Sequence, residues 1–200
     1  MKLLAQLSAL GIGLGLLVGC SREPAPAPVT GSEAVDAAQV RLIDPAAITA
    51  KSVGIDDGQG YTDEFSHEFI VDENDGVGFA DGFLEFSADA EAVEQDVAIE
   101  ARWLGADGNY GYDFGPDGQQ FSEGVELAYE VGGILDSGLL QDGERLVLYW
   151  DLENGSLVEI PSELVIENGK AELKAVIHHF TKYIIGVGPP PGGDGGGGNN

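Results

Sequence analysis

Apolar and polar residues alternate with a period of two through most of the chain after about residue 61, which is the pattern of half-buried β-strands. The alternating sets are Phe65, His67, Phe69 and Val71; Val97, Ile99, Ala101 and Trp103; Tyr110, Tyr112 and Phe114; and Val125, Leu127, Tyr129 and Val131. Glycine, aspartate and asparagine separate these runs, and the sequence has no long amphipathic helix and no clear repeat. Short strands at this spacing predict an all-β fold, an antiparallel β-sandwich in a single domain, rather than βαβ units.

Two Asn-Gly pairs predict hairpins near the C-terminal end of this pattern. Residues 146–150 and 157–160 flank Asn154-Gly155, and residues 164–166 and 171–177 flank Asn168-Gly169. Asn-Gly suits a two-residue type I′ turn, because both central residues of that turn need positive φ. Pro161 lies between the two hairpins and is expected to end one strand before the next begins.

The same region resembles the ZU-five domain, a β-sandwich of ankyrins, tight-junction scaffolds and netrin receptors with relatives in bacterial envelope proteins. The motifs that carry the resemblance are Phe114-Gly115-Pro116-Asp117-Gly118, Phe121-Ser122-Glu123-Gly124-Val125-Glu126-Leu127, Leu148-Tyr149-Trp150-Asp151, Asn154-Gly155 and His179-Phe180-Thr181-Lys182-Tyr183. The likeness is firmest over residues 112–183, and the chain departs from the pattern at Gly124, usually proline, and Thr181, usually serine. The resemblance implies a binding or scaffolding role without chemistry, and it places His179 at a structural corner beside Phe180 and Tyr183.

The N-terminus has the features of a bacterial lipoprotein signal. Lys2 precedes an apolar run that ends in Leu17-Val18-Gly19-Cys20, which resembles a lipobox cleaved between Gly19 and Cys20 with lipid attached to the cysteine. A retained membrane anchor is the alternative, but the run is shorter than the roughly 20 residues that a span requires. Cys20 is the only cysteine, so the protein forms no internal disulfide. The residue directly after the cysteine is Ser21 and not aspartate, which resembles the signal for outer-membrane sorting in enteric bacteria. We therefore expect the anchored protein at the outer membrane, facing the periplasm or the cell surface.

Composition divides the chain into five parts. We expect a signal peptide at residues 1–19, a Pro/Ala-rich linker at 20–36, short elements at 37–60, the sandwich at 61–187 and a disordered Gly/Pro-rich tail at 188–200. Within the third part, residues 40–43 suit an edge strand and residues 44–47 the capped first turn of a helix.

The chain is strongly acidic, with a formal net charge of −26, and removal of the signal peptide would take away Lys2 and no acid. A phosphate backbone binds cationic groups that release counterions, so nucleic acid is not an expected partner. Anionic headgroups would repel this surface as well, so we expect membrane attachment through the lipid alone.

Residues with catalytic potential form no recognisable constellation, and we expect the protein not to be an enzyme. His178 and His179 are adjacent, so their side chains point to opposite faces of a strand and are unsuited to share a metal. His67 lies in an aromatic strand without an evident partner, and no serine sits in a nucleophile-elbow motif. The 35 acidic residues make close carboxylate pairs uninformative, and no cofactor fingerprint or zinc spacing is present.

Calcium is the one cofactor that the sequence leaves open. Residues 72–76 and 107–109 are acidic, glycine-containing loops with many oxygen ligands, but neither fits the EF-hand order, and plain hairpin loops have the same composition. Two functions remain: a non-catalytic module that binds an envelope protein or is structural, or, as the alternative, a glycan-binding or calcium-assisted adhesion module. Exposed aromatics on a sheet face would favour glycans, and a groove at a sheet edge would favour a protein.

Overall fold

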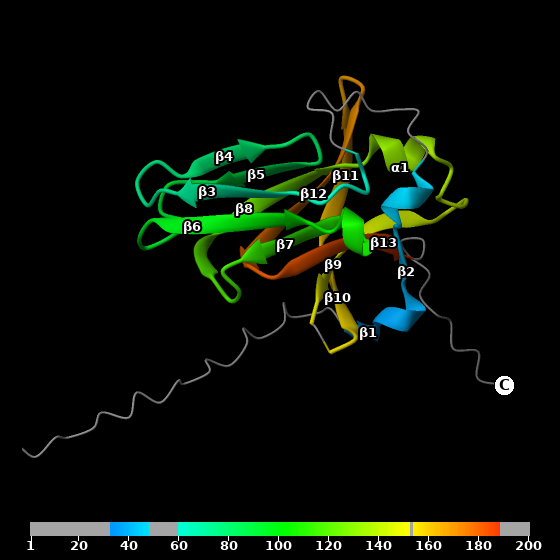
Figure 1. Cartoon of the computed structure of the whole chain (residues 1–200), viewed down its shortest axis with the longest axis horizontal. Coiled ribbons are helices and arrows are strands. Elements are labelled where there is room, and N and C mark those ends of the chain that lie inside the picture. Colours follow the sequence, from blue (N-terminus) through cyan, green and yellow to red (C-terminus); the bar gives the residue numbers. More distant parts are fainter. Residues whose placement is uncertain (1–32, 49–59, 153, 189–200) are drawn as a thin grey trace, which may run out of the picture.

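The computed structural model describes residues 33–48, 60–152 and 154–188, and these form a β-sandwich of two antiparallel sheets (Figure 1). The predicted all-β fold is confirmed. The alternating sets found in the sequence fall on strands whose inward residues are buried, among them Ile99, Trp103, Tyr112 and Leu127. The strands therefore form where period two lets one face of each strand enter a common core.

One sheet has eight strands in the order β1-β10-β9-β13-β7-β6-β3, with β2 paired to β13. Its members are β1 (Ala34–Asp36), β2 (Arg41–Leu42), β3 (Ser66–Val71), β6 (Val97–Trp103), β7 (Gly111–Gly115), β9 (Arg145–Asp151), β10 (Ser156–Ile160) and β13 (Lys182–Gly188). The strand β13 ends one residue beyond the predicted limit of the sandwich, because Gly188 still pairs with Arg145 of β9.

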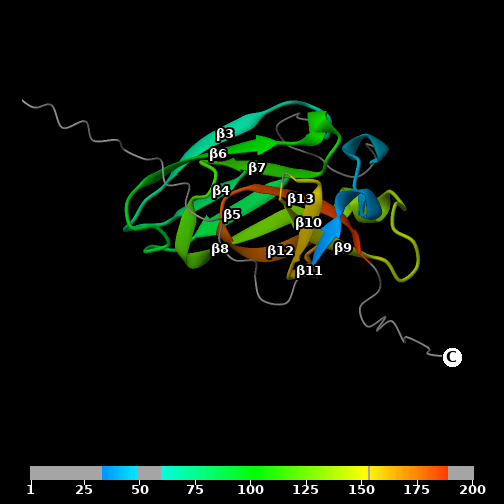
Figure 2. The same ribbon diagram turned by 90° about the horizontal axis from the view of Figure 1, so that it is seen from below.

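The other sheet has five strands in the order β11-β12-β8-β5-β4. Its members are β4 (Val77–Ala80), β5 (Leu84–Ala88), β8 (Gln120–Glu130), β11 (Ser162–Glu167) and β12 (Lys170–His179). The view in Figure 2 shows β5, β8 and β12 lying across from β3, β6 and β7. Aromatic rings fill the space between the sheets: the Trp103 ring stacks on Phe83 at 4.7 Å and Phe114 stacks on Phe180 at 5.3 Å.

The helical elements of the described residues are short. They are η1 (Ala37–Gln39), η2 (Pro45–Ala47), η3 (Gly105–Asp107) and α1 (Gly132–Asp136). Within the described ranges, none of them has the length and apolar character needed to cross a membrane.

The two predicted hairpins both form, but only one turn has the expected geometry. Asn168 and Gly169 have φ of 51° and 83° between the paired residues Glu167 and Lys170, so this two-residue type I′ turn is confirmed. The type I′ prediction for Asn154-Gly155 is wrong, because the register pairs Leu157 with Asp151 and the Leu152 N–H donates to the Ser156 carbonyl at 3.0 Å. Residues 152–155 thus join β9 to β10, and Gly155 has the left-handed φ of 83°.

The segment from 33 to 48, here called the N-terminal strap, belongs to the sandwich. It contributes β1 against β10 and β2 against β13, and it buries Ile43 and Ile48 in the main core. The strap also covers the outer face of the larger sheet, where Val147, Tyr149 and Leu157 form a second, smaller cluster. The fold therefore extends before residue 61, its expected start, and the end of the expected linker is a strand. Both patterns at residues 40–47 are realised: β2 lies within 40–43, and the Asp44 carboxylate caps η2 by accepting from Ala46 N at 2.9 Å.

Pro161 separates β10 from β11 as predicted, and here the chain also passes from the larger sheet to the smaller one. The β11–β12 hairpin projects beyond the body of the sandwich in Figure 1. Leu164 and Ile166 lie on the inward face of β11, opposite Leu173 and Ala171, yet they remain 42% and 64% exposed. Their exposure follows from the projection of the hairpin past the strands of the other sheet.

Candidate functional site

The His-Phe-Thr-Lys-Tyr corner has the predicted packing. Phe180 and Tyr183 are each 1% exposed, and the Tyr183 hydroxyl donates to the His179 carbonyl at 2.8 Å. His179 is buried while His178 is exposed, so the predicted opposite orientation of the two histidines is confirmed. The Lys182 side chain is 26% exposed and lies 3.7 Å from the Asp151 carboxylate.

The surroundings of the His179 imidazole favour its neutral form. Burial lowers its pKa below 6.5, a hydrogen bond with the Phe180 backbone opposes that shift, and the neighbouring His178 adds to it. The ring lies 4.2 Å from the Trp150 ring, and no described carboxylate pairs with it. These contacts fit the structural role that the resemblance implies for His179.

His67 has a partner that the sequence did not reveal. Its Nε2 lies 3.3 Å from Oδ2 of Asp81, although the two atoms form no hydrogen bond. Asp81 is 9% exposed overall and its side chain 1%, which makes it one of two buried polar residues in the described chain, with His179. A histidine beside a buried acid is the arrangement that would suggest an enzyme.

The hydrogen bonds of Asp81 explain why this carboxylate is inside. One oxygen accepts from the Phe83 and Leu84 amides, both at 2.9 Å, and the other accepts from the Tyr112 hydroxyl. The first two bonds close the β4–β5 turn, where Gly82 at φ 90° supplies the positive φ that the turn requires. The third bond joins this turn to β7 of the opposite sheet, and it contributes, after burial, to raising the Tyr112 pKa. Asp81 therefore acts as a polar tie between the two sheets.

The acidic loops considered for calcium use their carboxylates in other contacts. Oδ1 of Asp72 accepts from the Asn74 and Asp75 amides at 2.8 and 3.1 Å, as in an ordinary capped turn. Asp107 pairs with Arg102 at 2.9 Å. Over residues 33–48, 60–152 and 154–188, no group of three or more His, Cys, Asp or Glu side chains is arranged to hold a metal ion. The loop at residues 115–118 is the plain β7–β8 turn, and its Gly115-Pro116 peptide bond is cis.

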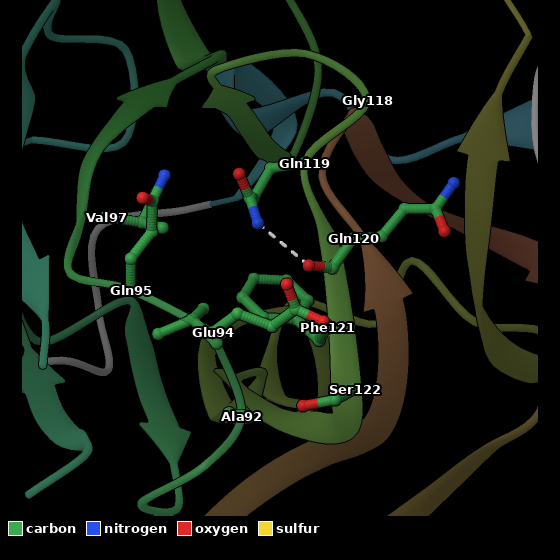
Figure 3. Close-up of a pocket in the computed structure, with 10 residues that line it drawn as sticks. Ala92, Glu94, Gln95, Val97, Gly118, Gln119, Gln120, Phe121 and Ser122 are labelled. Atoms are coloured by element: carbon green, nitrogen blue, oxygen red, sulfur yellow. Dashed lines mark hydrogen bonds between the residues drawn. The ribbon is translucent and has the colours of Figure 1, made fainter. Parts of the chain in front are cut away.

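One hollow in the surface is polar. Residues 92–95, Val97 and residues 118–122 line a volume of about 700 Å³ (Figure 3). The Gln119 side chain donates to the Gln120 carbonyl at 2.8 Å across it. Phe121, its only aromatic residue, is 6% exposed and belongs to the core, so it offers little surface on which a sugar ring could stack.

A second hollow, here called the edge groove, lies where the chain crosses between the sheets. It has a volume of about 600 Å³ and is lined by Glu126, residues 160–163, residues 174–179 and Tyr183. Its floor is apolar, because Ile160, Ala175 and Ile177 are buried beneath it. On its outer wall, Val176 is 53% exposed and lies against Gly124, where an added Cβ would come within 2.3 Å of Val176 Cγ1.

The edge groove exists because β11 is shorter than β12 and does not pair with its last residues. The pairing of β11 with β12 stops at Ser162 and Ala175, so residues 176–179 of β12 have no strand beside them on that side within the described residues. Pro161, next in line, has no N–H to offer. The structure thus leaves part of an inner strand open at a sheet edge.

Charges border the edge groove. Glu163 and Glu126 are exposed, while Lys174 lies 3.5 Å from both Glu126 and Glu172. Attraction to Glu126 is the largest contribution to the raised pKa of Lys174. The border therefore carries more negative than positive charge, as the whole chain does.

The predicted lipidation site, Cys20, and the predicted cleavage site between Gly19 and Cys20 lie outside the described residues, as does most of the tail at 188–200. One local signal in the sequence could have predicted the turn that holds Asp81: Asp81-Gly82 between Phe79 and Phe83 has the composition of a tight hairpin turn.

No model of a known protein family matches this chain, and no curated protein matches its sequence.

Proposed function

We propose that this protein is a lipid-anchored component of the bacterial cell envelope, attached to the membrane through Cys20, whose acidic β-sandwich binds an envelope protein without catalysing a reaction. The observation that carries the binding role is the edge groove, a hollow with an apolar floor at the open edge of β12. Protein partners use such edges, because an added strand pairs with the backbone while side chains fill adjacent pockets. The resemblance to the ZU-five domain, which implies binding or scaffolding, favours the same role.

The other candidate functions have less support. The large hydrophobic side chains exposed in the described residues are aliphatic, namely Val35, Ile70, Leu164, Ile166 and Val176, whereas a glycan site would favour exposed aromatics. The His67–Asp81 pair has the composition of a catalytic pair, but the Asp81 oxygens already accept from Phe83, Leu84 and Tyr112. A structural tie accounts for all of these contacts.

Site-specific photo-crosslinking in intact cells tests the proposal. A photo-crosslinking residue would replace Val176 beside the groove or Ile70 on β3, both exposed aliphatic positions of different sheets. We expect the protein in the membrane fraction and a covalent product with another envelope protein from at least one position. A protein found in the soluble fraction without acyl label, and with no crosslinked product from either position, would refute the proposed function.

A further inference from the structure

The open edge of β12 presents backbone groups in a known direction. In the β11–β12 hairpin the two-residue turn makes Glu167 and Lys170 a hydrogen-bonded pair, so even-numbered residues of β12 direct their N–H and C=O toward β11. The Ala171 carbonyl accepts from Val131 N on the β8 side at 2.8 Å, which agrees with this alternation. The N–H and C=O of Val176 therefore face the edge groove.

The Val176 carbonyl is available to a ligand, because Pro161, the residue in line with it, has no N–H with which to pair it. The Val176 N–H is directed at the Pro161 carbonyl, since the non-hydrogen-bonded pair of Ser162 and Ala175 comes directly before them. Buried backbone groups are almost always paired, and those at an open sheet edge are a template for another strand. The apolar floor beneath, with Ile160 and Ile177, would receive the inward side chains of such a strand.

The charges around the edge groove indicate what kind of strand would bind there. Glu163 borders the groove, is exposed and forms no ion pair among the described residues. Lys174 is already close to two glutamates, Glu126 and Glu172. A second copy of this chain would bring together two surfaces of formal charge −26, which opposes self-association. A strand with cationic side chains meets complementary charge instead.

We propose that the edge groove binds an extended, cationic segment of a partner protein, which adds as a β-strand to residues 176–179 of β12 and places an apolar side chain on the groove floor. This inference rests on the proposed function and names the site and the chemistry of the partner segment. The added strand would continue the line of β11, with a backbone N–H donated to the Val176 carbonyl and a Lys or Arg beside Glu163.

The binding test uses the full-length protein in detergent and a synthetic peptide, Lys-Val-Lys-Val-Lys-Val, with its acidic counterpart Glu-Val-Glu-Val-Glu-Val. We expect the cationic peptide to bind and to shift the backbone amide resonances of residues 176–179. N-methylation of every second residue of the peptide, which removes donors from one edge, should weaken binding roughly tenfold for the edge that pairs with β12. Equal binding of the acidic peptide, or resonance shifts confined to other faces, would overturn the proposal.

Variants of the protein separate this site from general attraction to an acidic surface. Glu163→Lys and Glu167→Lys form a matched pair, because both glutamates point outward on β11, opposite Lys174 and Lys170, but only Glu163 borders the groove. We expect Glu163→Lys alone to weaken binding by roughly fivefold.

Equal effects of Glu163→Lys and Glu167→Lys would mean that the peptide binds by diffuse attraction, and the site would be refuted. The photo-crosslinking experiment distinguishes the two proposals: an envelope protein captured from Ile70 but not from Val176 would support the proposed function and overturn the edge groove as its site.

Discussion

Replacement of Asp81 by alanine should be the most destabilising polar substitution in this sandwich. The change removes the acceptor of three donors: the amides of Phe83 and Leu84, each at 2.9 Å, and the Tyr112 hydroxyl. Because the Asp81 side chain is only 1% exposed, water does not readily replace it. A buried donor left without a partner costs about 1–3 kcal/mol. With some relaxation around three donors, we expect Asp81→Ala to lower the free energy of unfolding by about 3–5 kcal/mol.

Asp72 provides a matched control. Its Oδ1 also accepts from two amides in the turn that follows it, those of Asn74 and Asp75, but that turn is exposed and water can take over. We expect Asp72→Ala to cost less than about 1 kcal/mol. Asp81→Asn should fall between the two, because its amide oxygen can still accept from the backbone while the charge-assisted bond from Tyr112 is lost.

Urea denaturation of the full-length protein and its variants, followed by circular dichroism, measures these differences. At an m-value of about 2 kcal/mol per molar, the expected loss for Asp81→Ala lowers the midpoint by about 2 M. A double-mutant cycle with Asp81→Asn and Tyr112→Phe should give a coupling energy of about 0.5–3 kcal/mol. Midpoints for Asp81→Ala and Asp72→Ala that agree within error would refute the role of Asp81 as a tie between the sheets.

Three further predictions concern the anchor and the corner. Cys20→Ser should abolish incorporation of a clickable fatty acid, whereas label that persists in the variant would exclude Cys20 as the attachment site. Phe180→Ala should lower the free energy of unfolding by about 3–5 kcal/mol, because the side chain is 1% exposed and stacks on Phe114. Lys182→Ala loses one ion pair at 3.7 Å and should lower it by less than about 1 kcal/mol. Equal urea midpoints for the two variants would contradict this packing. Burial lowers the His179 pKa, so the unfolded chain binds more protons just below pH 6.5, and stability should fall as pH decreases from about 7 toward the folded-state pKa. His179→Gln should reduce this pH dependence strongly, and exposed His178→Gln should reduce it less, because His178 only adds to the effect of burial. Unchanged pH profiles for both variants would refute the assignment.

Period-two patterns predicted β3, β6, β7, β8 and the two later hairpins, because a half-buried strand needs only one apolar face, but they did not mark β4 and β5. They were insufficient for the strap and for the Asn154-Gly155 loop. The outer face of β9 carries Val147 and Tyr149, so β9 is apolar on both faces, which indicates that another segment covers it. The sequence contained this signal without naming the segment. The register of β9 with β10, which sets the length of the loop between them, depends on packing across the whole sheet.

The candidate site was less predictable, because both of its parts depend on long-range contacts. Asp81 and His67 are adjacent in space only because β3 and the β4–β5 turn meet across the sandwich. The edge groove arises from the point at which the β11–β12 pairing stops, and spacing along the chain does not set that point. The likeness to the ZU-five domain, the lipid on Cys20 and the identity of the partner stay predictions.

The N-terminal strap determines which part of the domain would bear a pulling force first. With Cys20 attached to the membrane as proposed, a pull on the sandwich would load β1 first, and β1 is held to β10 by three residue pairs at the edge of the sheet. Short edge elements open at a small fraction of the global unfolding free energy. Detachment of residues 33–42, which precede the core residues Ile43 and Ile48, would lengthen the tether by up to about 35 Å and uncover Val147, Tyr149 and Leu157. Tension would thus be absorbed by an extensible segment before it reached β12 and the edge groove on the other sheet.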